Sequence, residues 1–215
     1  MTVKPPRSDD DRGQAYTLEG FIGAMIVLMA VLFALQSVVI TPTTGGAADR
    51  AIQSQVQQEA QDALVVASSA ADDDLSYMLR YWDDDGGFAE TDQRGPGQQV
   101  YSADRFAEEF TLGEILNDRF TEDGQNYNVE LQYANASTGP SEDLEWENQT
   151  LVYQGSPSAD AVTASYTVTL YNGQTVTSDE SDDPINETEP PTIPSKYDDD
   201  DSSLYNVVEV RVIVW

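Results

Sequence analysis

The sequence contains no cysteine and no histidine among its 215 residues. Without cysteine no disulfide can form, so a folded domain must be held together by its apolar core. Without histidine the chain lacks the commonest general base and the commonest protein ligand of zinc and copper. The sequence also contains no phosphate-binding glycine loop and no G-x-S-x-G motif. We therefore expect no enzyme, and we assign no catalytic residue.

The sequence also contains few basic residues. The formal net charge is −29, from 39 acidic and 10 basic residues, and the only lysines are Lys4 and Lys196. Because phosphate contacts need lysine and arginine, we expect no nucleic-acid partner. The mutual repulsion of carboxylates is screened by salt, and the Debye length falls from about 10 Å at 0.1 M to about 3 Å at 1 M. The composition resembles that of proteins from halophilic archaea, with an ordinary acidic secreted protein as the alternative.

Against this acidic background stands one long uncharged run, Phe21 to Ile40, of twenty residues. At about 1.5 Å per residue such a helix spans about 30 Å, the thickness of a bilayer core. A buried helix of a soluble domain and a cleaved secretory signal peptide are the alternatives. Signal peptides usually have an apolar region of about 7–15 residues that ends at a small-residue cleavage site. We interpret residues 14–41 as a retained transmembrane helix.

Basic residues around this helix predict its orientation. Lys4, Arg7 and Arg12 precede it, whereas only Arg50 follows it closely. Because basic residues stay on the cytoplasmic side, we expect a single-pass protein of the cell membrane with a cytoplasmic N-terminus. The predicted parts are a leader at 1–13, the membrane helix, a hinge at 42–47 with one proline and two glycines, and an extracellular domain at 48–215.

Periodicity predicts the structure of the outer domain. Apolar residues recur every three or four positions from Ile52 to Ala70, as in an amphipathic helix, and again in shorter stretches. After Gly124 the period changes to two, which is typical of half-buried strands. The predicted fold class is α+β: a long N-terminal helix with a transmembrane half and an amphipathic half, then short helices and a C-terminal antiparallel β-sheet.

Smaller elements of the outer domain are predicted as follows. The short helices fall near 75–82 and 106–120, and the strands at 127–133, 150–154, 162–171 and 205–215. Asn172-Gly173 is a strong hairpin signal, so 174–177 is expected to return as a strand. Residues 83–99 are predicted as a loop, and the acidic, proline-bearing segment 178–203 as a long mobile loop.

The N-terminal motifs carry a family resemblance. Arg12-Gly13-Gln14, Tyr16-Thr17-Leu18-Glu19 and the apolar run, followed by a helix-then-sheet layout, resemble type IV pilins. The resemblance implies a leader of the class III signal peptide type, cut by a prepilin peptidase. A cut after Gly13 makes Glu19 the sixth mature residue, and a cut after Gln14 makes it the fifth, as in bacterial members. The outer domain resembles pilin-like proteins of halophilic archaea.

The resemblance also implies assembly. A carboxylate near hydrocarbon is costly unless it is paired, and cleavage creates a free amino group that Glu19 of a neighbouring subunit can meet. The alternative is that Glu19 merely snorkels to the interface. Gly20 and Ala24 have a small-xxx-small spacing that permits close helix approach, and Gly23 adds to that surface.

The expected function is therefore that of a structural pilin-like subunit. Its expected partners are the prepilin peptidase, other pilin-like subunits and a membrane assembly platform, in a surface filament or pseudopilus. A monomeric single-pass surface protein, whose outer domain binds a ligand or partner, is the rival hypothesis.

Two further kinds of site are candidates. Asp83 and Asp85 offer the carboxylate oxygens that Ca²⁺ takes, although a solvated aspartate run explains them equally. We expect no other cofactor. Asn135, Asn148 and Asn186 each begin an N-x-S/T glycosylation motif on the side predicted to be exported.

Overall fold

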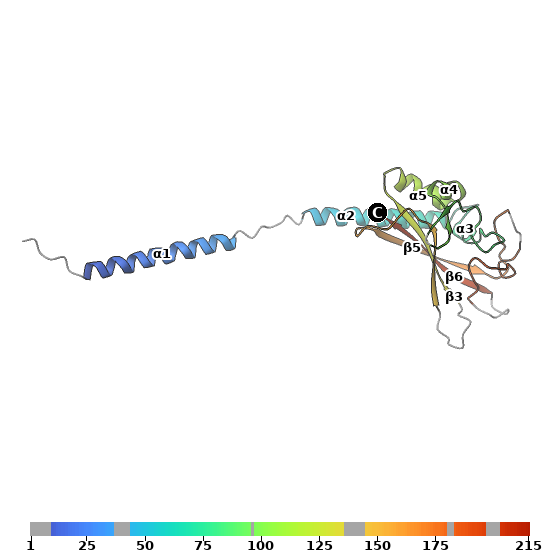
Figure 1. Ribbon diagram of the computed structural model, residues 1–215. Helices are drawn as coiled ribbons and strands as arrows, with labels where there is room; N and C mark the ends of the chain where they lie inside the picture. The colour runs from blue at the N-terminus through green and yellow to red at the C-terminus, as the bar shows by residue number, and fades with distance from the viewer. Residues whose placement is uncertain (1–9, 37–43, 96, 136–144, 180–182, 197–202) are drawn as a thin grey trace, which may run out of the picture. The chain divides into compact units, whose positions relative to one another are not determined.

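The computed structural model describes residues 10–36, 44–95, 97–135, 145–179, 183–196 and 203–215 (Figure 1). The chain divides into two compact units, Met1–Ala47 and Ala48–Trp215. Each unit is described by itself below.

The first unit is dominated by helix α1, Asp10–Gln36. The 18 residues Tyr16–Phe33 form a helix that is long and apolar enough to cross a membrane, with a mean hydropathy of 2.0. Helix α1 includes the last residues of the predicted leader. It ends at Gln36, and the remainder of the predicted span, to residue 41, lies outside the described residues.

Helix α2, Thr44–Ala67, starts inside the segment predicted as a hinge. Gly45 and Gly46 each cost a helix about 1 kcal/mol relative to alanine, and this is too little to keep their backbone out of the helix. The amphipathic pattern predicted for this helix is present, because its alanines and one leucine face the core. These buried residues are Ala60, Ala63, Leu64 and Ala67.

Shorter helices follow, in the two regions where they are predicted. Helix α3 begins after Asp74, whose side chain accepts a hydrogen bond from Tyr77 N at 2.7 Å, as N-cap residues do. Ser102 caps α4 in the same way through Arg105 N at 3.1 Å. The bounds are α3 Leu75–Met78, α4 Ala103–Glu109, α5 Thr111–Leu116 and the short π-helical η1 Asn117–Thr121.

The sheet has four antiparallel strands in the order β4-β3-β6-β5. The predicted α+β fold class is confirmed. The C-terminal strand β6 lies between β3 and β5, as its β-branched residues favour. Two very short strands, β1 and β2, pair within the segment predicted as a loop. The bounds are β1 Gln93–Arg94, β2 Gln99–Val100, β3 Tyr127–Asn135, β4 Glu145–Val152, β5 Val162–Tyr171 and β6 Leu204–Val214.

One face of the sheet forms the core. Alternate residues of β6 are buried, and in Figure 1 the helices α2, α4 and α5 lie together on one side of the strands. The opposite face carries polar rows such as Ser165, Arg211 and Glu130, which are register partners across three strands. The core is rich in aromatics, and its largest fully buried members are Trp82, Tyr101, Tyr127, Tyr205, Phe106, Phe110 and Phe120.

The segment predicted as a mobile loop, 178–203, is attached to the core at several of the residues that the structure describes. Ile185 and Ile193 are fully buried. Tyr205 Oη donates to Ile193 O at 2.7 Å, and Thr192 Oγ1 donates to Gly87 O at 2.7 Å. Two isoleucines are enough to attach this acidic segment to the core. The overall composition of the segment does not reveal them.

The predicted hairpin after β5 is only partly correct. Gly173 has a φ of +82°, as the turn requires. Residues 174–177 do not form a returning strand, however: β6 is the neighbour of β5 in the sheet, and no described strand pairs with the other edge of β5. Val176 N instead donates to Asp183 O at 2.9 Å, within the packed segment.

Three glutamines of α2 bind along the free edge of β5. Gln57 Nε2 donates to Thr163 O at 3.1 Å, and Gln61 Nε2 donates to Ser165 O at 3.2 Å. One turn earlier, Gln53 Nε2 donates to Asp160 Oδ1 at 3.4 Å. The two carbonyls would otherwise remain unpaired at a sheet edge, where strands of other chains can add. We call these three side chains the glutamine ladder.

Candidate functional site

Helix α1 exposes its apolar side chains on every side. From Tyr16 to Phe33, twelve large apolar side chains are between 49% and 79% exposed. Burying one such side chain is worth about 1.5–3 kcal/mol, so leaving all of them in water is strongly unfavourable. A helix with this surface is stable in a bilayer or against other apolar helices.

The predicted assembly residues lie on this helix. Glu19 and Gly23 are one turn apart, as are Gly20 and Ala24, and all four are exposed. A Cβ added at Gly20 or Gly23 would meet no atom within 4 Å. Within the described part of this single chain, the small-residue surface is therefore open.

The predicted processing residues Arg12, Gly13 and Gln14 belong to the first turns of α1. Only their backbone is described, and it is helical. The structure places them directly before the exposed stretch, which begins at Tyr16.

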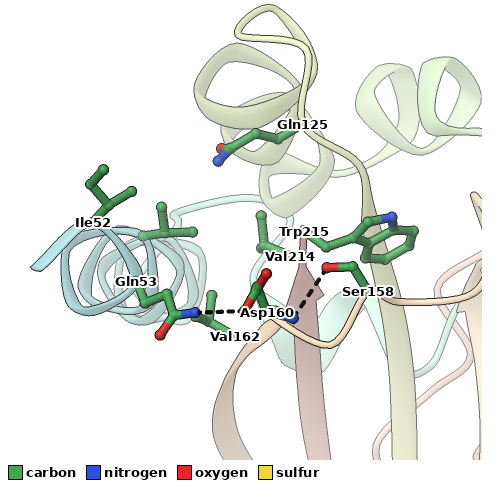
Figure 2. A pocket seen from close by; sticks show the side chains of 9 residues that line it. Ile52, Gln53, Gln125, Ser158, Asp160, Val162, Val214 and Trp215 are labelled. Atoms are coloured by element: carbon green, nitrogen blue, oxygen red, sulfur yellow. Dashed lines mark hydrogen bonds between the residues drawn. The ribbon is translucent and has the colours of Figure 1, made fainter. Parts of the chain in front are cut away.

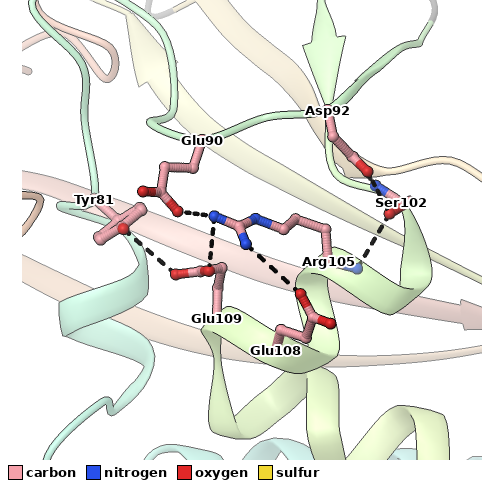
Figure 3. Close-up of polar contacts among 7 residues, drawn as sticks. All are labelled: Tyr81, Glu90, Asp92, Ser102, Arg105, Glu108 and Glu109. Atoms are coloured by element: carbon pink, nitrogen blue, oxygen red, sulfur yellow. Dashed lines mark hydrogen bonds and ion pairs between the residues drawn. The ribbon is translucent and has the colours of Figure 1, made fainter.

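The outer domain has one arginine surrounded by carboxylates (Figure 3). Arg105 of α4 pairs with Glu90, with Glu109 at 2.9 Å and with Glu108 at 3.6 Å. Tyr81 Oη donates to Glu109 Oε2 at 3.4 Å. Burial, and then the charge of Glu109, raise the pKa of Tyr81 to about 12.

This cluster holds the segment before β1 against α4. Glu90 has a φ of +57°, a conformation that a non-glycine residue adopts only when its surroundings hold it. Close by, the Asp92 carboxylate accepts from both Ser102 N and Ser102 Oγ at 2.6 Å. Arg105 and its three carboxylates pair with one another within the fold, so we interpret the cluster as structural.

A pocket of about 240 Å³ lies between α2, the start of β5 and the end of β6 (Figure 2). Most of its surface is apolar. Gln53, Ser158 and Asp160 lie together, where Asp160 accepts from Gln53, and Gln125 lies apart from them. Asp160 N also donates to Ser158 Oγ at 3.3 Å. The lining residues are Ile52, Gln53, Val56, Gln125, Ser158, Asp160, Val162, Val214 and Trp215.

Among the described residues of the outer domain, the most exposed large apolar side chain is that of Trp146, at 61%. It lies in β4 opposite Ala134 of β3. The sequence pattern predicts this strand at 150–154, whereas β4 begins at Glu145 and includes the tryptophan. This part of the strand is hard to recognise in the sequence, because it contains three polar residues of low β propensity: Glu147, Asn148 and Gln149.

The calcium candidates are engaged in a turn. Asp83 Oδ1 accepts from Asp85 N at 3.0 Å and from Gly87 N at 2.8 Å. Among the described residues, no three acidic side chains converge on a point that could hold a metal ion. We do not carry the calcium hypothesis further.

The glycosylation candidates lie in three different settings. Asn148 is exposed on β4, and Asn186 is exposed in a turn where its Oδ1 accepts from Gly173 N at 3.2 Å. Asn135 ends β3 and donates to Glu147 Oε1 at 2.6 Å. The remainder of its motif, including Ser137, lies outside the described residues.

Comparison with known families gives one match. A model described as a family of unknown function (DUF7288) matches residues 12–214. The chain belongs to the DUF7288 family. The DUF7288 match includes the exposed stretch of α1 as well as the whole sheet, so helix and outer domain belong to one family pattern. No curated protein and no solved structure gives a match.

Proposed function

We propose that this chain is a membrane-anchored, pilin-like structural subunit. In this proposal a prepilin peptidase removes the leader after Gly13 or Gln14, and α1 stays on the mature subunit as its anchor. The N-terminus is cytoplasmic and the outer domain is extracellular. Subunits associate through α1, on a membrane assembly platform, into a surface filament or pseudopilus.

The observation that carries the proposal is the uniform exposure of the apolar helix from Tyr16 to Phe33. A core helix of a soluble domain would bury one face, whereas this one buries none. A signal sequence would be discarded, yet the DUF7288 match continues without a break from α1 into the sheet. An anchor that also serves as the assembly surface accounts for both facts.

Glu19 supports assembly more than anchoring alone. It is the only charged residue between Tyr16 and Phe33, and a charge in such a stretch raises the cost of insertion. The amino terminus of a processed neighbour would neutralise it. Gly20 and Gly23, with open space around them, would let that neighbour approach.

The test is pull-down of untagged by tagged full-length chains from membranes. Glu19→Gln keeps the shape and removes the charge, so we expect recovery of the untagged chain to fall while membrane insertion stays normal. Asp62→Asn, at an exposed position of α2, is the matched control and should change nothing. Equal recovery from wild type and Glu19→Gln would remove the pairing hypothesis.

Processing has an independent readout. We expect the mature N-terminus at Gln14 or Ala15, with the apolar helix retained. An intact Met1 on the mature protein would argue against the pilin-like assignment. A terminus beyond Thr41 would exclude it, because the anchor would be lost.

The rival hypothesis, a monomeric surface protein that binds a ligand, has the pocket beside α2 in its favour. The two hypotheses differ in the mass of the particle extracted from membranes. A monomer that keeps its α1 would favour the rival, and a multiple of the subunit mass would favour the pilin-like proposal.

A further inference from the structure

The pocket beside α2 has the chemistry of a receptor for an indole side chain. Its volume of about 240 Å³ is below the 300–1,000 Å³ typical of small-molecule sites. Val56, Val162 and Val214 supply apolar walls. Asp160 supplies an acceptor at the rim, and an indole combines a large apolar body with a single N–H donor.

The outer domain also displays an unpartnered indole. Trp146 projects from β4 and is 61% exposed, although a tryptophan gains more from burial than any other side chain. Tryptophans in such positions are enriched among the residues that dominate the energy of protein interfaces.

Pocket and tryptophan lie toward opposite ends of the sheet. Val214, in the pocket wall, is paired with Tyr127 at the start of β3, whereas Trp146 is paired with Ala134 near its end. Seven residues of strand separate these positions by about 23 Å. Trp146 therefore cannot fill the pocket of its own chain.

Charge favours a second copy as the source of the indole. Residues 51–58 of α2, which border the pocket, carry no charge in a chain of net charge −29. Arg50 is exposed and lines an adjoining hollow that shares Gln53 and Val162 with the pocket. Trp146 lies between Glu145 and Glu147, so the strand that carries it is negative and would be attracted to the side of α2 that carries Arg50.

We propose that Trp146 of one subunit inserts into the pocket between α2 and the ends of β5 and β6 of the next subunit. The indole N–H then donates to Asp160, and the acidic strand β4 lies on the side of α2 that carries Arg50. Because the two surfaces differ and lie at opposite ends, the contact is head to tail and does not close on a pair. This inference rests on the proposed function. The contact would join the outer domains of neighbouring subunits, as such an assembly needs.

The absence of cysteine makes crosslinking a clean test. Asn148→Cys, two residues from Trp146, and Ser54→Cys, beside the pocket, are placed on separate full-length chains with different tags. Both positions are exposed. After mild oxidation in membranes we expect a mixed disulfide dimer. Ser69→Cys, two residues beyond the C-terminal end of α2 and also exposed, replaces Ser54→Cys as the control and should give none.

Trp146→Ala in the Asn148→Cys chain should lower the yield of mixed dimer about tenfold or more, as for a central interface tryptophan. Trp146→Phe, which keeps an aromatic side chain but is smaller and lacks the N–H, should give an intermediate yield. Tyr171→Ala removes another half-exposed aromatic and should have no effect. Free indole should lower the dimer yield when both chains keep Trp146 and the wild-type pocket residues.

A dimer yield that Trp146→Ala leaves unchanged would overturn the proposal, even if the pocket binds free indole. Absence of the mixed dimer from membranes in which tagged chains still recover untagged chains would also overturn it, and would leave assembly through α1 standing. Conversely, a Trp146-dependent dimer that survives Glu19→Gln would support the outer-domain contact and count against the role of Glu19.

Discussion

Helix α1 and the outer domain are stable in opposite surroundings. Between Tyr16 and Phe33 there is one charge, and every large apolar side chain is exposed. From Ala48 to Trp215 there are 35 acidic and 7 basic residues, and the apolar side chains are gathered into a core. The first region buries none of these side chains within the chain itself. The second contains its own core, but the carboxylates on its surface repel one another.

Salt should separate the two regions most clearly. We expect the outer domain, expressed from Ala48, to unfold or expand below about 0.5 M salt, because carboxylate repulsion is then poorly screened. Circular dichroism and hydrodynamic radius across a salt series measure this. The helicity of the full chain's α1 in vesicles should not follow the same curve. An outer domain that is indifferent to low salt would refute the proposed adaptation to a salty medium.

Equal truncations in the two regions should have unequal effects. Phe106 is fully buried, with its ring 5.3 Å from that of Phe110 and 5.8 Å from that of Tyr101. Phe106→Ala should lower the free energy of unfolding of the outer domain by about 3–5 kcal/mol in high salt. Phe21→Ala should leave that free energy unchanged, as chemical denaturation would show. A large effect of Phe21→Ala would mean that α1 contributes to the core.

Two glycines offer a matched pair on a smaller scale. A Cβ at Gly113 would lie 2.0 Å from Phe106 O, which is backbone and cannot turn aside, whereas Gly20 has open space. Gly113→Ala should destabilise the outer domain by about 1–3 kcal/mol or more. Gly20→Ala should spare its thermal midpoint and, under the proposed function, reduce recovery of untagged chains from membranes. A stable Gly113→Ala variant would contradict the packing of α4 on α5.

The smallest effect concerns alkaline pH. Because the folded pKa of Tyr81, about 12, is above its ordinary value near 10, folding retains its proton. Its contribution is complete below pH 10 and is lost as pH rises toward 12. Between pH 9 and pH 11 the free energy of unfolding should therefore fall by about 1 kcal/mol less in Tyr81→Phe than in the wild type. Denaturation at pH 9 and pH 11 measures it, and parallel losses in variant and wild type would contradict the assignment.

Much of this fold is predictable because periodicity reports burial directly. The helix of α2 and the strands β3, β5 and β6 were all predicted close to their observed positions, since each has one apolar face. Strand β4 was largely missed. It is an edge strand with polar residues on both faces near Trp146, so neither period nor β propensity marks it.

The sites divide in the same way. The apolar run that contains Glu19 is visible in the sequence, because a membrane-length stretch is a property of consecutive residues. The pocket is not, since Val56, Asp160 and Val214 are brought together only by tertiary packing. The packed course of residues 183–196 also escaped prediction, because its two isoleucines are surrounded by acidic residues and prolines.

The glutamine ladder has a mechanical consequence. Gln53, Gln57 and Gln61 run in the same direction as β5, so tension entering the domain through α2 would load their hydrogen bonds in shear, all together. Four residues of helix advance about 6.0 Å, whereas two residues of strand advance about 6.7 Å. The spacing of the glutamines therefore falls behind the spacing of their acceptors, so only a few such hydrogen bonds can form in a row. Inserting a single residue between Gln57 and Gln61 would rotate the second by about 100° and release it from the strand. The helix is thus held to the sheet in one register, and force applied to α2 would be shared by these hydrogen bonds along the edge of the sheet.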